Sequence, residues 1–286
     1  MAPPVLTAPK VYEGKCPEEA GGPGTVIYTG DVLIKLPTNR VCGGSIIVAR
    51  ARNVRITGGS IVYNGSNKEA VITIKDSSGT ALIDGLSIDV NDKFSDAIRA
   101  VRNTGRLIVQ NTRISGVTGQ PSGPHGDITH AQGGGPLSEL TLQNVSAYTG
   151  YQGLFTPYRP TEGHGTHKLT LDRVNFGYDP NIPSSSKPLM LLFMGSATDA
   201  TNRPPDRGTT LSNVYVDVSL WQNQLRGFAY NKAIYAGPTV QGDGCASFAA
   251  ANKISGRACG GRPPAGDFAP KERVGLAYNR AYFCTN

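Results

Sequence analysis

The sequence has few charged side chains and no long apolar run. Asp, Glu, Lys and Arg make up 17% of its 286 residues, and no stretch is apolar enough to form a membrane-spanning helix. A dense Lys/Arg cluster is missing as well, and so is any recognisable nucleic-acid-binding motif. We therefore expect neither a membrane nor a nucleic acid as partner.

The charge that is present has one sign in excess. The formal net charge is +7 and the sequence pI is about 9.2. A basic excess attracts nucleic acid, anionic lipid or an acidic polymer. With the first two disfavoured, an anionic polymer is the partner that the charge balance favours.

Helical periodicity is also scarce. Leu-rich patterns with the spacing of an amphipathic helix are hard to find, whereas glycine is abundant, with 36 residues. This combination indicates β structure with many turns. The length is compatible with one large all-β domain that buries its own core.

Cysteine is absent from the middle of the chain. Cys16 and Cys42 lie near one end, and Cys245, Cys259 and Cys284 near the other. This placement predicts terminal disulfides in an oxidising compartment, with Cys16 bonded to Cys42 and one pair among the last three. The alternative is free thiols in a cytosolic protein. The spacing does not fit a zinc site.

No signal peptide is visible at the start of the chain. The opening Met1-Ala-Pro-Pro is what an initiator methionine placed on a mature exported chain would look like. Together with the cysteines, this start predicts a secreted or periplasmic protein.

What the sequence does contain is a repeat. Six segments share the pattern apolar, any, apolar, any, turn residue, any, any, apolar: residues 53–63, 81–90, 107–116, 140–149, 169–178 and 210–219. The second apolar position falls at Ile56, Ile83, Val109, Leu142, Leu171 and Leu211. The turn position falls at Gly58, Gly85, Asn111, Asn144, Arg173 and Asn213. Mostly glycine and asparagine there predict a bend with left-handed backbone angles.

A second strand is expected in each unit between these copies. The segments are residues 70–74, 96–101, 126–132, 153–158 and 189–194. Units of similar length with insertions on particular turns are typical of a solenoid, in which each unit covers its neighbour. A β-sandwich would show hairpin turns instead. We predict an all-β fold, a single-stranded right-handed parallel β-helix, with the insertions at 117–124, 179–187 and 197–208 as groove walls.

Three parts of the chain follow from this reading. Residues 1–24 are rich in Pro and Gly and form an irregular entry segment, and residues 25–222 form the β-helix. Residues 223–286 lose the repeat and hold three cysteines. They are expected to cap the last unit or to fold back along the solenoid, because an open parallel edge invites aggregation.

All four histidines lie in or just after the stretch from residue 123 to 159. Equivalent positions of stacked strands are about 4.8 Å apart, so this stretch should bring its polar residues onto one surface. Aligning Ile98, Ile128 and Leu154 as inward residues turns Asp127 outward and leaves His130 in an inward position. The strand then either ends before His130, so that the ring turns out at a corner, or His130 is a core residue.

The repeat turns ITGGSIV, IDGLSID and VQNTRIS resemble those of the pectate-lyase-like superfamily of right-handed β-helices. His125-Gly-Asp127, then Gln132, then YQGLF is similar to secreted bacterial β-helix proteins that act on polysaccharides. The resemblance covers most of residues 25–220 and implies an extracellular carbohydrate-active enzyme with its groove on a parallel sheet.

Two departures from that superfamily bear on the chemistry. The paired acids of polygalacturonases are absent, although Gly163-His-Gly165 resembles their Gly-His-Gly. The aspartate cluster that holds calcium in pectate lyases is not evident either. We therefore predict no cofactor, and calcium is the one metal that stays open, although no clear site for it is found.

The leading hypothesis is a polysaccharide lyase that cleaves a uronate-containing polymer by β-elimination. This reaction needs a base, an acid for the leaving oxygen and a cation for the carboxylate. The candidate catalytic residues are His125, Asp127, His130, Tyr151 and Tyr158, with His130 or His125 as base and Tyr151 or Tyr158 as acid. The candidate substrate-binding residues are Arg99, Gln132, Gln152, Arg159 and His164.

Two alternatives stay open. A glycoside hydrolase needs two carboxylates about 5 to 9.5 Å apart, for which Asp127 could pair with Asp96 or Glu162. A non-catalytic β-helix would bind sugars by stacking them on tyrosines and on Phe155.

Overall fold

The structure is a computed structural model of the chain. It describes residues 2–66, 69–120, 125–156, 158–159, 161–179, 181–182, 190–194, 203, 205–217, 245–247 and 254–284. Most of the predicted insertions at 179–187 and 197–208, and most of residues 218–253, lie outside these ranges.

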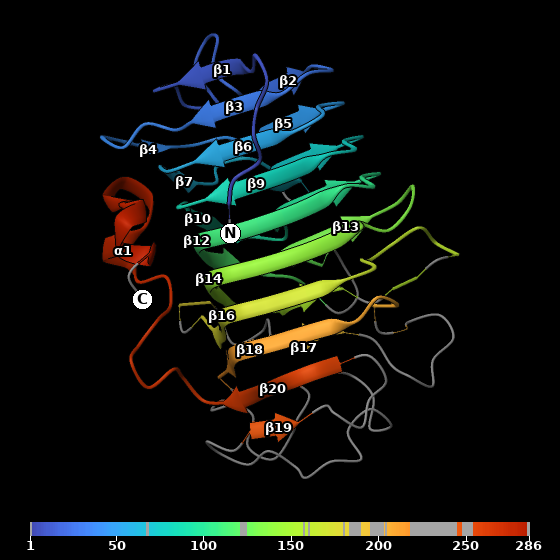
Figure 1. Cartoon of the computed structure of the whole chain (residues 1–286). Coiled ribbons are helices and arrows are strands. Elements are labelled where there is room, and N and C mark those ends of the chain that lie inside the picture. Colours follow the sequence, from blue (N-terminus) through green and yellow to red (C-terminus); the bar gives the residue numbers. More distant parts are fainter. Residues whose placement is uncertain are drawn as a thin grey trace.

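Two long parallel sheets build the molecule (Figure 1). The larger sheet runs in the order β1 (Lys10–Glu13), β3 (Val32–Lys35), β6 (Val54–Thr57), β9 (Thr80–Asp84), β12 (Arg106–Val117), β14 (Glu139–Thr149), β16 (Leu169–Tyr178), β18 (Thr209–Val216), β20 (Ile254–Gly260) and β19 (Cys245–Ser247). Alongside this path lie β4 (Val41–Cys42), β7 (Ser60–Val62) and β10 (Ser87–Lys93). The smaller sheet runs β2 (Thr25–Ile27), β5 (Ile46–Ala49), β8 (Ala70–Lys75), β11 (Asp96–Val101), β13 (Thr129–Gln132), β15 (Gln152–Phe155) and β17 (Met190–Phe193).

The chain alternates between the two sheets, one unit at a time. Within the described residues the pairings between named strands are parallel except that of β19 with β20. Each strand therefore bonds to its counterpart in the next unit, for example β11 to β8 and β13. Figure 1 shows the units stacked along one axis, from β1 and β2 to β18 and β20. This all-β arrangement is compatible with the predicted parallel β-helix.

The predicted alignment of the repeat is confirmed. Its second apolar positions pair across successive strands, as Val109 does with Leu142 and Leu142 with Leu171. The same register joins Ile56, Ile83 and Leu211 to this column. All six side chains are buried, so the column forms part of the core between the sheets.

The predicted left-handed turns are also confirmed. Gly58 and Gly85 have φ of 62° and 79°, and the non-glycine residues at the turn position have φ between 51° and 54°. The side chains at this turn bond along the stack: Asn144 Nδ2 donates to Asn111 Oδ1 at 2.8 Å, and Arg173 Nε donates to Asn144 Oδ1 at 2.5 Å.

The N-terminal segment is not entirely irregular, and the C-terminal segment does more than cap the last unit. Residues 10–13, expected to be irregular, form β1 and extend the larger sheet. Beyond β20, residues 263–284 turn back along that sheet and include the short helices η2 (Lys271–Arg273), η3 (Gly275–Ala277) and α1 (Arg280–Cys284) (Figure 1). The fold-back alternative therefore describes this segment.

Both predicted disulfides are present. Cys16 bonds to Cys42, and Cys245 bonds to Cys259, which leaves Cys284 as an exposed thiol. Disulfides are compatible with an oxidising location outside the cytosol. In the described part of the chain, no helix has the length and apolar character needed to cross a membrane.

Candidate functional site

The smaller sheet places a ladder of side chains on its outer face. Arg99 of β11 pairs with His130 of β13, which pairs with Phe155 of β15. All three side chains are partly exposed, whereas the residues before them in these strands are buried. His130 therefore faces outward.

This register corrects the sequence-based alignment by one residue. Ile98 pairs with Thr129, not with Ile128. The prediction that His130 occupies an inward position is wrong, because β13 begins only at Thr129 and the inward position is taken by that threonine. Ile128 is also buried, which is why apolar character alone indicated the wrong phase.

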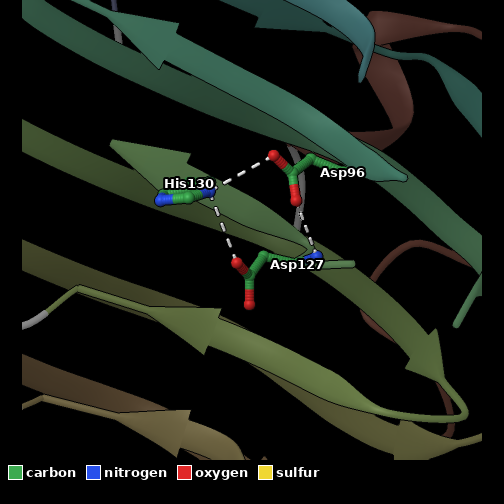
Figure 2. A group of neighbouring side chains, drawn as sticks. All are labelled: Asp96, Asp127 and His130. Atoms are coloured by element: carbon green, nitrogen blue, oxygen red, sulfur yellow. Dashed lines mark hydrogen bonds and ion pairs between the residues drawn. The ribbon is translucent and has the colours of Figure 1, made fainter. Parts of the chain in front are cut away.

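Asp96, at the start of β11, collects the polar contacts of the site (Figure 2). Its Oδ2 accepts a hydrogen bond from Arg99 Nε at 2.6 Å and lies 3.3 Å from His130 Nδ1. Its Oδ1 accepts the backbone N–H of Asp127 at 2.9 Å. Asp127 Oδ2 lies 3.5 Å from the same His130 nitrogen. Two carboxylates therefore hold one edge of the imidazole.

Two of these four side chains are buried and two are partly exposed to solvent. The side chains of Asp96 and Asp127 are 0% and 4% exposed, and those of Arg99 and His130 are 23% and 24% exposed. In Figure 2 the second nitrogen of His130 points away from both carboxylates. Because a carboxylate beside Nδ1 favours the tautomer with its proton there, Nε2 is the nitrogen left for chemistry.

The residues that lead into the site explain the local path. Gly126 lies where a Cβ would come within 2.2 Å of the Thr118 backbone oxygen, so only glycine allows this approach. The carbonyl of the next residue, Asp127, then accepts a hydrogen bond from Ala97 N of the neighbouring strand β11 at 2.9 Å. The Gly-Asp pair of the sequence is thus what brings Asp127 against Asp96.

The two buried carboxyls titrate in opposite directions. Burial opposes ionisation of Asp96, but the hydrogen bond and charge of His130 and the charge of Arg99 outweigh it, so its pKa is lowered. Burial and the negative charge of Asp96 raise the pKa of Asp127 to about 8. At neutral pH Asp96 is ionised and Asp127 carries a proton.

Two histidines on this surface are also shifted in opposite directions. Burial alone would lower the pKa of His130, but the hydrogen bond that its Nδ1 donates to Asp96 and the negative charge of that carboxylate raise it above its usual value. The ring of His164 lies 6.4 Å from that of His130, and burial together with the charge of His130 lowers the pKa of His164. One ring therefore favours the imidazolium form and its neighbour the neutral form.

Further predicted residues surround this pair. Arg159 forms an isolated bridge with His164, an ion pair with Glu162 at 3.1 Å and a cation–π contact over the Phe155 ring at 5.2 Å. Glu162 also lies 3.8 Å from His164 Nδ1. Arg99 and Arg159 thus supply positive charge on either side of the histidines.

Other predicted residues lie apart from this cluster. Tyr151 is fully buried, and its hydroxyl has no hydrogen-bond partner within the described residues. Gln152 is buried as well, whereas Gln132 is exposed at the end of β13. His125 is exposed, and its ring lies 5.4 Å from that of Tyr151. Neither Tyr151 nor Gln152 presents a surface that a polymer can reach in this structure.

Tyr158 faces another histidine. Its ring lies 5.0 Å from that of His167, whose Nδ1 is 2.8 Å from Asp206 Oδ1. His167 is partly exposed, since 21% of its side chain is accessible.

Asp96, Asp127 and His130 could also hold a metal ion, since each offers one ligand atom within 4.8 Å of the others. Calcium does not suit this set, because it takes six to eight oxygen ligands. Arg99 already occupies Asp96 Oδ2 at 2.6 Å, and its charge repels a second cation. We interpret the set as an ion-paired cluster, and the absence of a metal stays a prediction.

The sequence analysis named Asp96 only as a second carboxylate for a hydrolase, yet it organises the site. The signal that could have found it is its place in the repeat. Asp96 precedes Ala97-Ile98 as Asp127 precedes Ile128-Thr129, so these two neighbouring units both place an acid at the entry of the strand. Comparisons with protein-family models, curated proteins and solved structures found no match for this chain.

Proposed function

We propose that the chain is an exported right-handed parallel β-helix of the pectate-lyase-like kind. Two parallel sheets between which the chain alternates, and a column of left-handed turns, support this proposal. Right-handedness rests on the general rule that crossovers between parallel strands of one sheet are right-handed in about 98% of cases.

We further propose that this protein is a lyase that cleaves a uronate-containing polysaccharide by β-elimination. The observation that carries the proposal is the pair of partly exposed histidines, with ring centres 6.4 Å apart, whose surroundings favour opposite protonation states. Environments that separate the pKa values of neighbouring groups indicate an acid and a base. A hydrogen-bonded carboxylate behind His130 adds the orientation that such a group needs.

Each residue then has one role in the reaction. Neutral His164 removes the proton on the carbon next to the sugar carboxylate. The electron pair that is released forms a carbon–carbon double bond, and the bond to the glycosidic oxygen breaks. His130, as imidazolium held by Asp96, gives its proton to that oxygen. The products are an unsaturated uronate end and a new hydroxyl end, so protons and electrons balance.

The carboxylate of the sugar needs positive charge while its neighbouring carbon loses a proton. Arg159, ion-paired with Glu162, and Arg99, ion-paired with Asp96, are partly exposed on this surface. Each guanidinium has five N–H donors, so those not engaged by its partner are the groups proposed to bind the sugar carboxylate. Phe155, between His130 and Arg159, offers an aromatic face on which a sugar ring can stack. Tyr151, predicted as a possible acid, has no part in this scheme because it is buried.

A glycoside hydrolase is the second candidate, since Asp127 carries a proton at neutral pH as a general acid must. Against it, both carboxyls are buried and the exposed groups between them and solvent are His130 and Arg99. Carboxyls in this position cannot stand on either side of a glycosidic bond.

The test is to incubate the protein with a panel of acidic and neutral polysaccharides. Unsaturated ends, read by their ultraviolet absorbance, and reducing ends are followed in parallel. We expect both signals to rise together on a uronate polymer. Reducing ends without absorbance would instead support the hydrolase, and binding without either signal would support a non-catalytic sugar-binding protein.

Variants assign the roles. His130→Ala and His164→Ala should each lower kcat/KM at least about a hundredfold, the usual range for a lost acid or base. His167→Ala is the matched control, because this histidine is similarly exposed but pairs with Asp206. Thermal melting should stay close to wild type for His164→Ala and His167→Ala, whereas His130→Ala leaves buried Asp96 paired with Arg99 alone and should lower the melting temperature. Equal loss of activity in the control would contradict the assignment.

The pH dependence gives an independent check. His164 must be neutral, and its pKa is lowered, so activity rises as pH passes upward through a value below the ordinary histidine range. His130 must be charged, and its pKa is raised, so activity falls as pH passes a value above that range. We expect a bell-shaped profile of kcat/KM with a broad top around neutral pH.

A further inference from the structure

A pocket lies on the larger sheet, away from the histidine site. It encloses about 620 Å³ and is lined by residues of β3, β6 and β9 and by the C-terminal segment. Figure 1 shows α1 beside the ends of these strands. Its lining carries four cationic side chains, from Lys35, Arg40, Arg55 and Arg280, and two acidic ones, from Glu13 and Asp84.

Arg55 is the unpaired cation of this pocket. Lys35 bonds to Glu13 at 3.2 Å, and Arg40 bonds to Glu19 at 2.6 Å. Arg55 is half-buried, has no ion pair among the described residues, and its buried Nε has no hydrogen-bond acceptor there. A buried donor without an acceptor is unfavourable. Arg55 lines the pocket and is only half-buried, so a small shift of its side chain lets an oxyanion there accept from Nε.

Asp84 has the converse feature, an acceptor oxygen without a donor. Its side chain is 1% exposed, and its Oδ1 accepts hydrogen bonds from Tyr278 and Asn111 at 2.7 and 2.8 Å. Its Oδ2 has no donor within hydrogen-bonding distance in the described part of the chain. Arg280 Nε is 3.9 Å from that oxygen, and the Arg280 side chain is 40% exposed. This outer group can move aside to let a donor reach Oδ2.

A ligand that satisfies both atoms carries an anionic oxygen for Arg55 and a hydroxyl for Asp84. The rest of the lining fits such a molecule, since Thr38, Asn39 and Thr57 offer neutral hydrogen-bonding groups and Tyr278 offers an aromatic ring. Sugars that bear a carboxylate combine these features.

We infer that this pocket is a second binding site for a carboxylate-bearing saccharide. The carboxylate lies against Arg55, and hydroxyls lie against Thr57 and Asp84. The choice of a uronate rests on the proposed function. That the ligand carries an anionic group and hydroxyls is inferred from Arg55 and Asp84 alone. The pocket lies on the larger sheet and His130 on the smaller, with His164 beside it, so the pocket holds polymer without cleaving it.

The test is a titration followed by nuclear magnetic resonance of the Arg55 Nε–H signal, assigned by its loss in Arg55→Gln. The probes are a uronate trisaccharide, the matching neutral trisaccharide and inorganic phosphate. We expect the uronate to shift this signal with saturation and to bind at least about tenfold more tightly than either of the others, because a bidentate charged pair and hydroxyl contacts act together.

Variants and controls separate this site from the catalytic one. Arg55→Gln should weaken uronate binding at this site about tenfold or more, and Arg55→Lys should weaken it less. Arg106→Gln is the matched control, since it removes the same charge from a half-exposed arginine of the same sheet. Perturbation at this site is read in the variants from the Tyr278 ring signals, assigned by Tyr278→Phe.

Three outcomes would overturn the inference. They are unchanged uronate binding in Arg55→Gln, equal binding of the neutral trisaccharide, and phosphate binding as tight as that of the uronate. Cleavage of a short substrate should stay at the wild-type rate in Arg55→Gln. If the protein cleaves no polysaccharide at all, the proposed function fails while this titration still decides the pocket.

Discussion

At the scale of single residues, one buried charge sets the protonation of its neighbours. Ionised Asp96 keeps a proton on Asp127 and favours the imidazolium form of His130. Arg99 in turn favours the ionised form of Asp96. The cluster therefore favours the imidazolium form of a partly exposed His130 whose two nearest carboxyls are buried, while the exposed Glu162 nearby is ion-paired with Arg159.

Asp127 should make the protein less stable as pH rises. Its pKa moves from the ordinary 3.8 to about 8 on folding, so between these values the folded state holds a proton that the unfolded state lacks. In this window the free energy of unfolding should fall by up to about 1.4 kcal/mol per pH unit from this group. Denaturant unfolding of wild type and Asp127→Asn across the window measures the difference.

The control for this prediction is Asp76→Asn. Asp76 is ion-paired with Arg102, and its pKa is lowered, so its contribution is constant over the same window and is lost only at lower pH. A difference between wild type and Asp127→Asn that does not change with pH would contradict a protonated Asp127.

Much of this residue-scale picture was within reach of the sequence. The stretch with Asp127 and His130 and the neighbouring Arg99, Arg159 and His164 were all singled out by composition and stacking. The phase of β13, which decides whether His130 points inward or outward, could not be predicted, because buried Ile128 and buried Thr129 are both compatible with an inward position. The burial of Tyr151 was missed for a related reason, since the sequence beside a strand does not show whether the core covers an aromatic hydroxyl.

At the scale of elements, the left-handed turns hold the strands of the larger sheet in register. Asn144 accepts from Arg173 and donates to Asn111, and it lies at φ 51°. A non-glycine residue in this conformation costs about 1 kcal/mol or more unless its side chain compensates by local hydrogen bonds. Three adjacent units are thus tied by side chains of the same turn position.

Substitution at Asn144 separates the two contributions. Asn144→Ala loses both hydrogen bonds and keeps the backbone strain, so the free energy of unfolding should fall by about 2 to 4 kcal/mol. Asn144→Gly loses the same bonds but relieves the strain, and it should be about 1 kcal/mol more stable than the alanine variant. Chemical denaturation of both variants measures this; an alanine variant as stable as the glycine one would contradict the account.

The elements themselves were largely predictable. The column from Ile56 to Leu211 and the turns beside it follow from a repeat that recurs in the sequence six times. The first and last residues of the strands were less predictable. Strands β13 and β15 are shorter than the apolar pattern, because Asp127 and the residues after Phe155 enter side-chain and bridge contacts that no alternation rule contains. Strand β1 was missed because its Lys-Val-Tyr-Glu has two charged ends.

At the scale of the whole molecule, the C-terminal segment binds distant units together. Asp267 accepts from Arg113 Nη1 at 2.6 Å, from Asn175 Nδ2 at 3.0 Å and from the Tyr148 hydroxyl. Further along, Tyr278 donates to Asp84 at 2.7 Å. Contacts at this separation in sequence leave no local pattern, so the sequence predicted that the segment caps or folds back without indicating its path.

Loss of Asp267 should release this segment. Asp267→Ala removes an acceptor shared by three donors, and the free energy of unfolding should fall by about 1 to 3 kcal/mol, the cost of unmet hydrogen bonds at a partly exposed site. Limited proteolysis within residues 263–284 should become faster at the same time. Glu272→Ala, at an exposed position of η2, is the control and should change neither. Unchanged proteolysis of the Asp267 variant would show that other contacts hold the segment.

The central claim is that the histidine pair cleaves a uronate polymer by elimination. The measurement that tests it most directly is the rate at which unsaturated ends form on acidic polysaccharides, with wild type, His130→Ala, His164→Ala and His167→Ala side by side. We predict absorbance from the unsaturated product with wild type and with His167→Ala, and at least about a hundredfold slower formation with the other two. Reducing ends formed without unsaturated product, or full activity in His130→Ala, would contradict the account.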